Sequence, residues 1–263
     1  MSELRDLVRR RRLLRLMARQ DVKSSFQNYR LGVIWALAEP FALALLIWVV
    51  FSFIRSGRAE SIGLDPFVIY IVTGLLPFQW LVRCMNKGPK VYKRYGEMLM
   101  SSPLPVWVWP IRIVNAAGAE FLISIPVIFA LMILFGASIT WGIVLLPVAM
   151  LVQYLLGSGV AMLGAALGLR VPDVAYLFAV MSRVLFWTSP ILWNGKDFPE
   201  PIQAWLYLNP FHFVLDLYRA TIWPEALPSF RDAAISITII AVIFITGSVL
   251  LKLRVNEVRR LVS

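Results

Sequence analysis

Residues 141–169 read WGIVLLPVAMLVQYLLGSGVAMLGAALGL, a stretch without a single charged side chain. An α-helix rises 1.5 Å per residue, so roughly 20 apolar residues cross the ~30 Å hydrocarbon core of a bilayer. The stretch is longer than one crossing needs, which predicts a tilted helix or a part that lies outside the bilayer. Gly164 and Gly168 form a small-xxx-small pair that lets a neighbouring helix approach closely. A phosphate-loop interpretation fails, because these glycines lie inside an apolar helix and no Lys-Ser or Lys-Thr follows them.

Five further apolar runs accompany this one, and the composition agrees with them. The chain of 263 residues is 59% hydrophobic and only 16% charged, which is too few charges to cover the surface of a soluble domain. The sequence therefore predicts an all-α polytopic membrane protein with six transmembrane helices. The six runs cover residues 33–54, 66–84, 105–135, 141–169, 174–193 and 233–251.

The distribution of lysine and arginine predicts the orientation of the chain. Six crossings place both termini on the same side of the membrane. Residues 1–31 carry nine basic residues, 83–103 five, the 170–173 turn one and the C-terminal tail four, against five in the connections of the other side. Because cytoplasmic segments are enriched in lysine and arginine, both termini are expected in the cytoplasm. The net charge of +11 is thus a topology signal rather than a sign of nucleic-acid binding.

The chain is expected to divide into a cytoplasmic segment 1–31, a transmembrane domain 32–251 and a cytoplasmic tail 252–263. Residues 3–19 place leucines on one helical face and arginines around the rest, which predicts an amphipathic helix in the membrane interface; a solvated basic tail is the alternative. No cleavable signal peptide is expected, because about 30 polar residues precede the first apolar run. Cys84 is the single cysteine, which excludes an intrachain disulfide and a multi-cysteine metal site.

The longest cytoplasmic loop between predicted spans is 87–103, KGPKVYKRYGEMLMSSP. A Gly-Pro pair ends the second span and a Ser-Pro pair precedes the third, so one short helix, Val91–Leu99, fits between them. This helix would expose Lys93, Arg94 and Glu97 beside tyrosines. Such a charged, aromatic helix is suited to docking against a partner; a plain solvated loop is the alternative.

Several ionisable residues fall within predicted spans, among them Glu39, Arg112, Glu120 and Arg183. Glu39 lies near the cytoplasmic end of the first span, where a carboxylate is costly unless paired or hydrated. It is a functional-site candidate, with a packing contact to a neighbouring arginine as the alternative. Arg112 and Glu120 in the third span lie too far apart along the helix to be direct neighbours, but they can bracket a hydrated face.

The outer connection 194–232 is long and partly apolar. Two short helices fit it, about Glu200–Tyr207 and about Pro210–Ile222. Asn209 is the expected N-cap of the second helix, followed by proline at the first helical position. Each helix is too short to cross the bilayer and is expected to lie on the outer leaflet or dip into it as a re-entrant helix.

The second of these helices carries His212, the only histidine of the chain, with Asp216 and Arg219 on the same side. A catalytic use of His212 is not favoured, because the nearest serines, Ser189 and Ser229, are distant in sequence. No Walker A loop, HExxH motif or G-x-S-x-G motif occurs. No catalytic residue and no metal site are therefore predicted, and the polar stripe is interpreted as part of a gate that faces a watery exit.

Four sequence patches recur in the order found in one family of membrane proteins. They are Asp21, Lys23, Phe26, Tyr29, Arg30, Leu31, Gly32, Trp35, Glu39 and Pro40; TGLLPFQW at 73–80; TSPILW at 188–193; and Asn209, Pro210, Asp216 and Arg219. The chain thus resembles the membrane-spanning permease subunits of ABC-2 type polysaccharide exporters, of the capsule and O-antigen class. At position 39 the chain resembles the capsule-export branch, because the O-antigen branch usually has asparagine where this chain has Glu39. Gln20 departs from the family, which commonly has arginine before the acidic residue.

The resemblance implies a homodimer of two six-helix subunits in the bacterial inner membrane, paired with two copies of a separate cytoplasmic ATPase. That ATPase would bind ATP and magnesium, while this chain would carry no cofactor and hydrolyse nothing. It would dock on residues 87–101, here through Tyr92, Lys93, Arg94 and Glu97, and near the N-terminal helix. Short re-entrant helices before the last span would form the outer gate, here with Asn209, Pro210, His212, Asp216 and Arg219.

A polysaccharide needs a path that spares its hydroxyl groups the cost of entering hydrocarbon, and aromatic faces suit sugar C–H groups. Arg30 and Glu39 are candidates for the cytoplasmic rim, where Arg30 would hold the phosphate of a lipid-linked glycan. The alternatives are an ABC-2 permease for a smaller lipid or drug and, from another class, a membrane glycosyl- or acyltransferase. The candidate path residues, many of which would equally serve as interfacial anchors, are Trp35, Phe41, Trp48, Phe51, Tyr70, Trp80, Phe186 and Trp187.

Overall fold

The computed structural model describes most of the chain from Phe67 onward. It describes residues 67–102, 104–137, 140–195, 198–199 and 205–262, together with Ala38, Phe41, Ala42, Leu45, Leu46, Val49 and Val50. The predicted interface helix, most of the first span, and the candidates Arg30, Trp35, Glu39, Trp48 and Phe51 lie outside the described residues.

Every regular element in this part of the chain is helical, as predicted. The elements are α4 (Phe67–Lys87), η2 (Gly88–Lys90), α5 (Val91–Ser101), α6 (Val108–Leu134), η3 (Trp141–Leu145), α7 (Leu146–Gly168), α8 (Val174–Thr188), α10 (Pro210–Ala220), η5 (Pro224–Ala226), α11 (Phe230–Leu253) and α12 (Val255–Val262).

Four helical segments of the described chain are long and apolar enough to cross a membrane: Phe67–Leu99, Val108–Leu134, Trp141–Gly168 and Phe230–Leu253. They correspond to the predicted second, third, fourth and sixth spans. The predicted fifth span, 174–193, contains only the 15-residue helix α8, which ends at Thr188. At 1.5 Å per residue α8 is about 22 Å long, shorter than the ~30 Å hydrocarbon core.

Helix α7 lies at the centre of the bundle and packs against α11, α4 and α6. The small residues of α7 allow this close packing. A Cβ atom built on Gly159 would lie 2.8 Å from the Cα atom of Phe244, and one built on Gly247 would lie 2.5 Å from the carbonyl oxygen of Gly159. The close helix approach predicted for this span is therefore present, but the closest helix pair is α7 with α11. In the predicted pair of Gly164 and Gly168, Gly168 faces η2 rather than a long helix. A Cβ on Gly168 would lie 2.3 Å from the carbonyl oxygen of Pro89 in η2.

Helix α4 is held to both of its neighbours by buried polar contacts. Gln153 of α7 is fully buried and donates from Nε2 to the carbonyl oxygen of Pro77, 2.6 Å away. Trp80 donates from its indole nitrogen to the carbonyl oxygen of Val114 in α6 at 3.1 Å. These bonds satisfy polar groups that the apolar interior would otherwise penalise.

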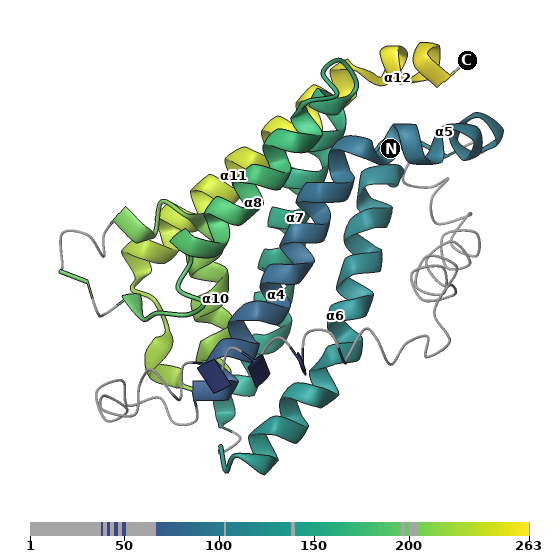
Figure 1. The fold of residues 1–263 in the computed structure, drawn as a ribbon. Coiled ribbons are helices and arrows are strands. Elements are labelled where there is room, and N and C mark those ends of the chain that lie inside the picture. The colour runs from purple at the N-terminus through teal and green to yellow at the C-terminus, as the bar shows by residue number, and fades with distance from the viewer. Residues whose placement is uncertain are drawn as a thin grey trace.

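The ends of the bundle carry the shorter helices. Figure 1 shows α5 and α12 at the same end, turned away from the direction of the long helices. Arg170, in the turn between α7 and α8, donates from Nε to Glu257 of α12 at 3.0 Å.

Helix α10 packs between α4, α7 and α11, and it contacts η3. A Cβ on Gly142 of η3 would lie 2.2 Å from the carbonyl oxygen of Ala220, so η3 and α10 meet backbone to backbone.

Candidate functional site

The start of α10 is fixed by Asn209, which the sequence predicted as its N-cap. Asn209 has an extended backbone, and its side-chain oxygen accepts a hydrogen bond from the backbone N–H of Phe211 at 3.0 Å. Its amide nitrogen donates to the hydroxyl of Ser189 at 2.9 Å. Pro210 occupies the first helical position, where a missing N–H costs nothing. The cap thus ties the first turn of α10 to the residue that follows α8.

Arg219 joins three segments inside the protein. Its guanidinium carbon lies 3.6 Å from the centroid of the Tyr70 ring in α4. Its Nη2 donates to the carbonyl oxygen of Pro190. Tyr70 reinforces the same junction, because its hydroxyl donates to the carbonyl oxygens of Trp193 at 2.6 Å and Pro190 at 3.2 Å. The cation–π contact and the carbonyl acceptor together stabilise a charge that is only 4% exposed.

Asp216 and His212 form a second polar group on the same helix. The hydroxyl of Tyr207 donates to Oδ2 of Asp216 at 3.0 Å, and Nε2 of His212 lies 3.5 Å from the same oxygen. The rings of Tyr207 and His212 stack with centroids 4.5 Å apart. Burial, and secondly the charge of Arg219, lower the pKa of His212 to about 4, so the imidazole is neutral at pH 7.

The expected exposure of the polar stripe is wrong for the single chain. His212, Asp216 and Arg219 are 4%, 9% and 4% exposed, so the stripe faces neighbouring helices rather than water. The physical reason is that each of the three side chains contacts a partner on Tyr207, Tyr70 or the chain after α8. Hydrogen bonds from these groups take the place of the water that the sequence interpretation assumed.

The predicted docking helix is present as α5, with a bend at Tyr95. Lys93, Arg94 and Glu97 are exposed, as expected. Tyr92 is not: it is 5% exposed, and its hydroxyl donates to the carbonyl oxygen of Val106 at 3.1 Å. Tyr92 therefore lies on the face of α5 that packs against the protein and cannot meet a partner directly.

Arg112, which the sequence placed on a hydrated face of the third span, instead supports α5. Its guanidinium carbon lies 4.7 Å from the ring centroid of Tyr95 and 5.6 Å from that of Trp109. Glu120, its expected companion, forms an ion pair with Arg83 of α4. Sequence reasoning missed this pair because it depends on how α4 and α6 are aligned. Gln79 and Ser124 line the same small hollow, which gives the α4–α6 contact a polar patch.

The candidate path aromatics do not form one surface. Tyr70 and Trp80 are 3% and 4% exposed and belong to the core. Phe186 is half-buried, with its ring centroid 5.4 Å from that of Phe78. Only Trp187, 69% exposed, and Phe41, 40% exposed, present their rings at the surface of the described chain.

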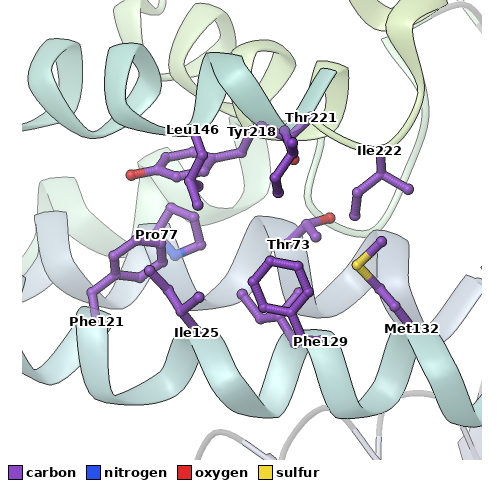
Figure 2. Close-up of a pocket in the computed structure, with 12 residues that line it drawn as sticks. Thr73, Pro77, Phe121, Ile125, Phe129, Met132, Leu146, Tyr218, Thr221 and Ile222 are labelled. Carbon is purple, nitrogen blue, oxygen red and sulfur yellow. The ribbon is translucent and has the colours of Figure 1, made fainter. Parts of the chain in front are cut away.

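A small apolar cavity lies between α4, α6 and α10. Figure 2 shows Phe121, Ile125, Phe129 and Met132 of α6 on one side, with Leu146, Tyr218, Thr221 and Ile222 opposite. Thr73 and Pro77 of α4 lie between them. The lining offers no charged group, so the cavity is not suited to a charged ligand. Within the described residues, no group of three or more His, Cys, Asp or Glu side chains is placed to hold a metal ion.

Comparison with known proteins agrees with this arrangement. The family model described as ABC-2 type transporter matches residues 12–223. The chain is 24% identical to the O-antigen export system permease protein RfbA of Myxococcus xanthus, over 90% of this chain and 92% of the relative. It is 23% identical to the protein of the same name from Klebsiella pneumoniae, over 90% and 87%. It is 22% identical to the polysialic acid transport protein KpsM of Escherichia coli, over 78% and 79%.

Proposed function

The chain belongs to the ABC-2 type transporter membrane family, and from this premise we propose that it is the permease subunit of an ATP-driven polysaccharide exporter. The observation that carries the proposal is the extent of the likeness. O-antigen export permeases match nearly the whole chain, and a polysialic acid transport protein matches most of it. The substrate class is a cell-envelope glycan such as O-antigen or capsule, attached to a lipid carrier.

The chain works without hydrolysing anything itself. A separate cytoplasmic ATPase binds ATP and magnesium and transmits its motion to the permease. Helix α5 supports this role, since it combines an exposed charged face of Lys93, Arg94 and Glu97 with a buried face held by Tyr92. A helix that is anchored through its buried face passes force to the bundle better than a solvated loop would.

The assembled transporter consists of two copies of this chain in the inner membrane, with both termini in the cytoplasm. The glycan moves between the two copies. The exposed rings of Trp187 and Phe41 support this path, because they are available to contact sugar C–H groups. On the outer side α10 controls the exit. Its buried contacts with Tyr70, Pro190 and Tyr207 hold a closed arrangement, and opening requires that some of them separate.

Complementation of a deletion strain tests the function. Loss of the chain should trap the glycan in the cytoplasm, and the wild-type gene should restore it to the surface. Surface glycan is measured with an antibody or lectin, and trapped glycan by composition analysis of the cytosol. If purified chain alone converted a sugar donor, or if deletion left surface glycans unchanged, the exporter function would be wrong.

The coupling role of α5 is tested with charge reversals. Lys93→Glu and Arg94→Glu should reduce export by about tenfold or more while the melting temperature of the purified chain stays unchanged, because both side chains are exposed. Tyr92→Ala is the contrasting variant. This change removes a buried ring and a hydrogen bond, so its main effect should be a lower melting temperature rather than a direct loss of docking. Full export by both charge reversals would exclude the docking role.

A further inference from the structure

Helix α8 carries an arginine in a place where a charge is costly. Arg183 lies nine residues after Val174, about 14 Å along the helix axis at 1.5 Å per residue. The surrounding helix, VAYLFAVMSRVLFWT, has no other charged residue. A charged side chain at the centre of a bilayer costs about 2.5–3.5 kcal/mol on insertion scales.

Arg183 is also exposed and lacks an internal partner in the described part of the chain. Its side chain makes no ion pair, hydrogen bond or ring contact with any residue that the structure describes. This contrasts with Arg112 and Arg219, which are buried and stack on aromatic rings. The protein thus satisfies its other intramembrane arginines internally and leaves Arg183 pointing outward.

The neighbours of Arg183 on the helix surface complete the pattern. Tyr176, Val180 and Trp187 lie seven and three residues before it and four residues after it, on the same side of a 3.6-residue helix. Their exposed fractions are 73%, 37% and 69%. A face that combines two large aromatic rings with a cation that has no partner among the described residues is suited to a polar, anionic ligand.

Arg183 lies five residues, about 7.5 Å along the helix axis, before the end of α8 at Thr188, and that end is joined to α10 through Ser189 and Asn209. The face that carries Arg183 therefore belongs to a helix that is fixed to the rest of the protein at this end.

We propose that Arg183, with Tyr176 and Trp187, forms an anion-binding station on the wall of the export path, which holds a phosphate or carboxylate group of the passing glycan. The inference rests on the proposed function and names a chemical feature of its substrate. The anion comes either from the phosphate of a lipid carrier or from acidic sugars in the chain. In both cases the guanidinium group offers paired N–H donors to two oxygens.

Two measurements on one set of variants test the proposal. Arg183→Leu and Arg183→Gln should lower export in the deletion strain by about tenfold, the value of one charge-assisted contact. Arg183→Lys should retain a large part of export, because it keeps the charge. The melting temperature of the Arg183→Leu protein should equal or exceed that of wild type, since the change removes a charge that has no partner among the residues that the structure describes. Met181→Gln, at an exposed site on another side of α8, is the matched control and should export normally.

Binding is measured directly on the full chain in nanodiscs of zwitterionic lipid. Inorganic pyrophosphate and glucuronate stand for the two sources of negative charge. At least one of them should raise the melting temperature of wild type, and Arg183→Gln should abolish the shift; the effective anion identifies the source. If neither anion stabilises the protein through Arg183, or if Arg183→Leu exports as well as wild type, the station does not exist. Failure of wild type itself to restore export would instead contradict the proposed function.

Discussion

Arg219 shows how one side chain can hold together the end of the bundle that carries α10. Its guanidinium group contacts a ring of α4 and a carbonyl oxygen after α8, while its own backbone belongs to α10. A planar cation with five N–H donors is needed for both contacts at once, because lysine cannot stack and donate sideways in the same way. The conformation of three segments therefore depends on this one residue.

Replacement of Arg219 by leucine should destabilise the chain by about 2–4 kcal/mol, because the carbonyl oxygen of Pro190 and the carboxylate of Asp216 lose a buried positive neighbour. Arg219→Lys should recover only part of the loss. The melting temperature in detergent measures both effects. Arg231→Leu, a change at an exposed site, is the control and should melt like wild type. An unchanged melting temperature for Arg219→Leu would mean that these contacts do not stabilise the fold.

His212 should make the stability of the chain sensitive to mild acid. Its pKa is about 4 in the folded protein and 6.5 in an unfolded chain, chiefly because burial disfavours the charged form. Between these values the unfolded chain binds a proton that the folded chain does not, so stability is complete above pH 6.5 and falls as the pH drops toward 4. The total loss is on the order of 3 kcal/mol.

Melting curves between pH 7.5 and pH 4 measure this effect. Carboxylates contribute their own acid sensitivity, so the comparison is with His212→Gln, which cannot gain the proton. The wild-type melting temperature should fall more steeply than that of the variant below pH 6.5. Parallel curves for the two proteins would show that folding does not lower the pKa of His212.

At the scale of elements, the contact between α7 and α11 is the tightest helix pairing of the described bundle. Gly159 and Gly247 face one another, so the helices meet through backbone atoms rather than side chains. In a bilayer, where lipid and leucine are equally apolar, such close contact replaces the hydrophobic effect as the source of helix association. The two helices are expected to move as one body during transport.

Gly247→Val should push α11 away from α7, because even its Cβ would lie 2.5 Å from the carbonyl oxygen of Gly159. The expected cost is about 1–3 kcal/mol, read as a lower melting temperature and a smaller yield of folded protein. Val249→Leu, at a half-exposed site two residues away, is the control and should be neutral. A normal melting temperature for Gly247→Val would show that the helices separate without loss.

Local signals explain which elements could be predicted from the sequence. The break at Gly88-Pro89, the short helix after it and the start of α10 at Asn209-Pro210 were all predictable, because turn and cap preferences act over a few residues. The end of α8 was missed because the Ser189-Pro190 pair was counted as part of the apolar span, although the residue before a proline disfavours the helical conformation. The same kind of signal correctly separated the second and third spans at Ser102-Pro103.

The candidate site was harder to predict, because its contacts join distant parts of the chain. The residue types of α10 were identified, but their burial depends on Tyr70 and Tyr207, which periodicity alone cannot pair with them. The same holds for Arg83 and Glu120. For α5, the sequence predicted the helix but not its rotation, so Tyr92 was assigned to the wrong face.

At the scale of the whole molecule, the two ends of the bundle differ in kind. One end carries α12 and α5, the latter with exposed charges, and the other end carries α10 and η5. The charge distribution predicts that the first end lies in the cytoplasm. The buried native Cys84 makes this testable, because it leaves a low labelling background.

Single cysteines at the two ends should react from opposite sides of the membrane. Glu97→Cys in α5 should react with a membrane-impermeant maleimide only after the cells are opened, whereas Glu225→Cys in η5 should react in intact cells. Both positions are exposed in the fold, so access depends on the membrane alone. Mass spectrometry of the purified protein gives the labelled fraction. The reverse pattern would invert the orientation and move α5 away from any cytoplasmic ATPase.

The backbone contacts at Gly142, Gly168 and Gly247 also bear on how this chain can change over generations. At each position a neighbouring carbonyl oxygen occupies the space in which any side chain would begin. Exposed apolar positions such as Leu151 and Val242 require only that the replacing residue is hydrophobic. Substitutions of these three glycines are expected to be rare during evolution. A compensating mutation would have to move a whole helix rather than a neighbouring side chain.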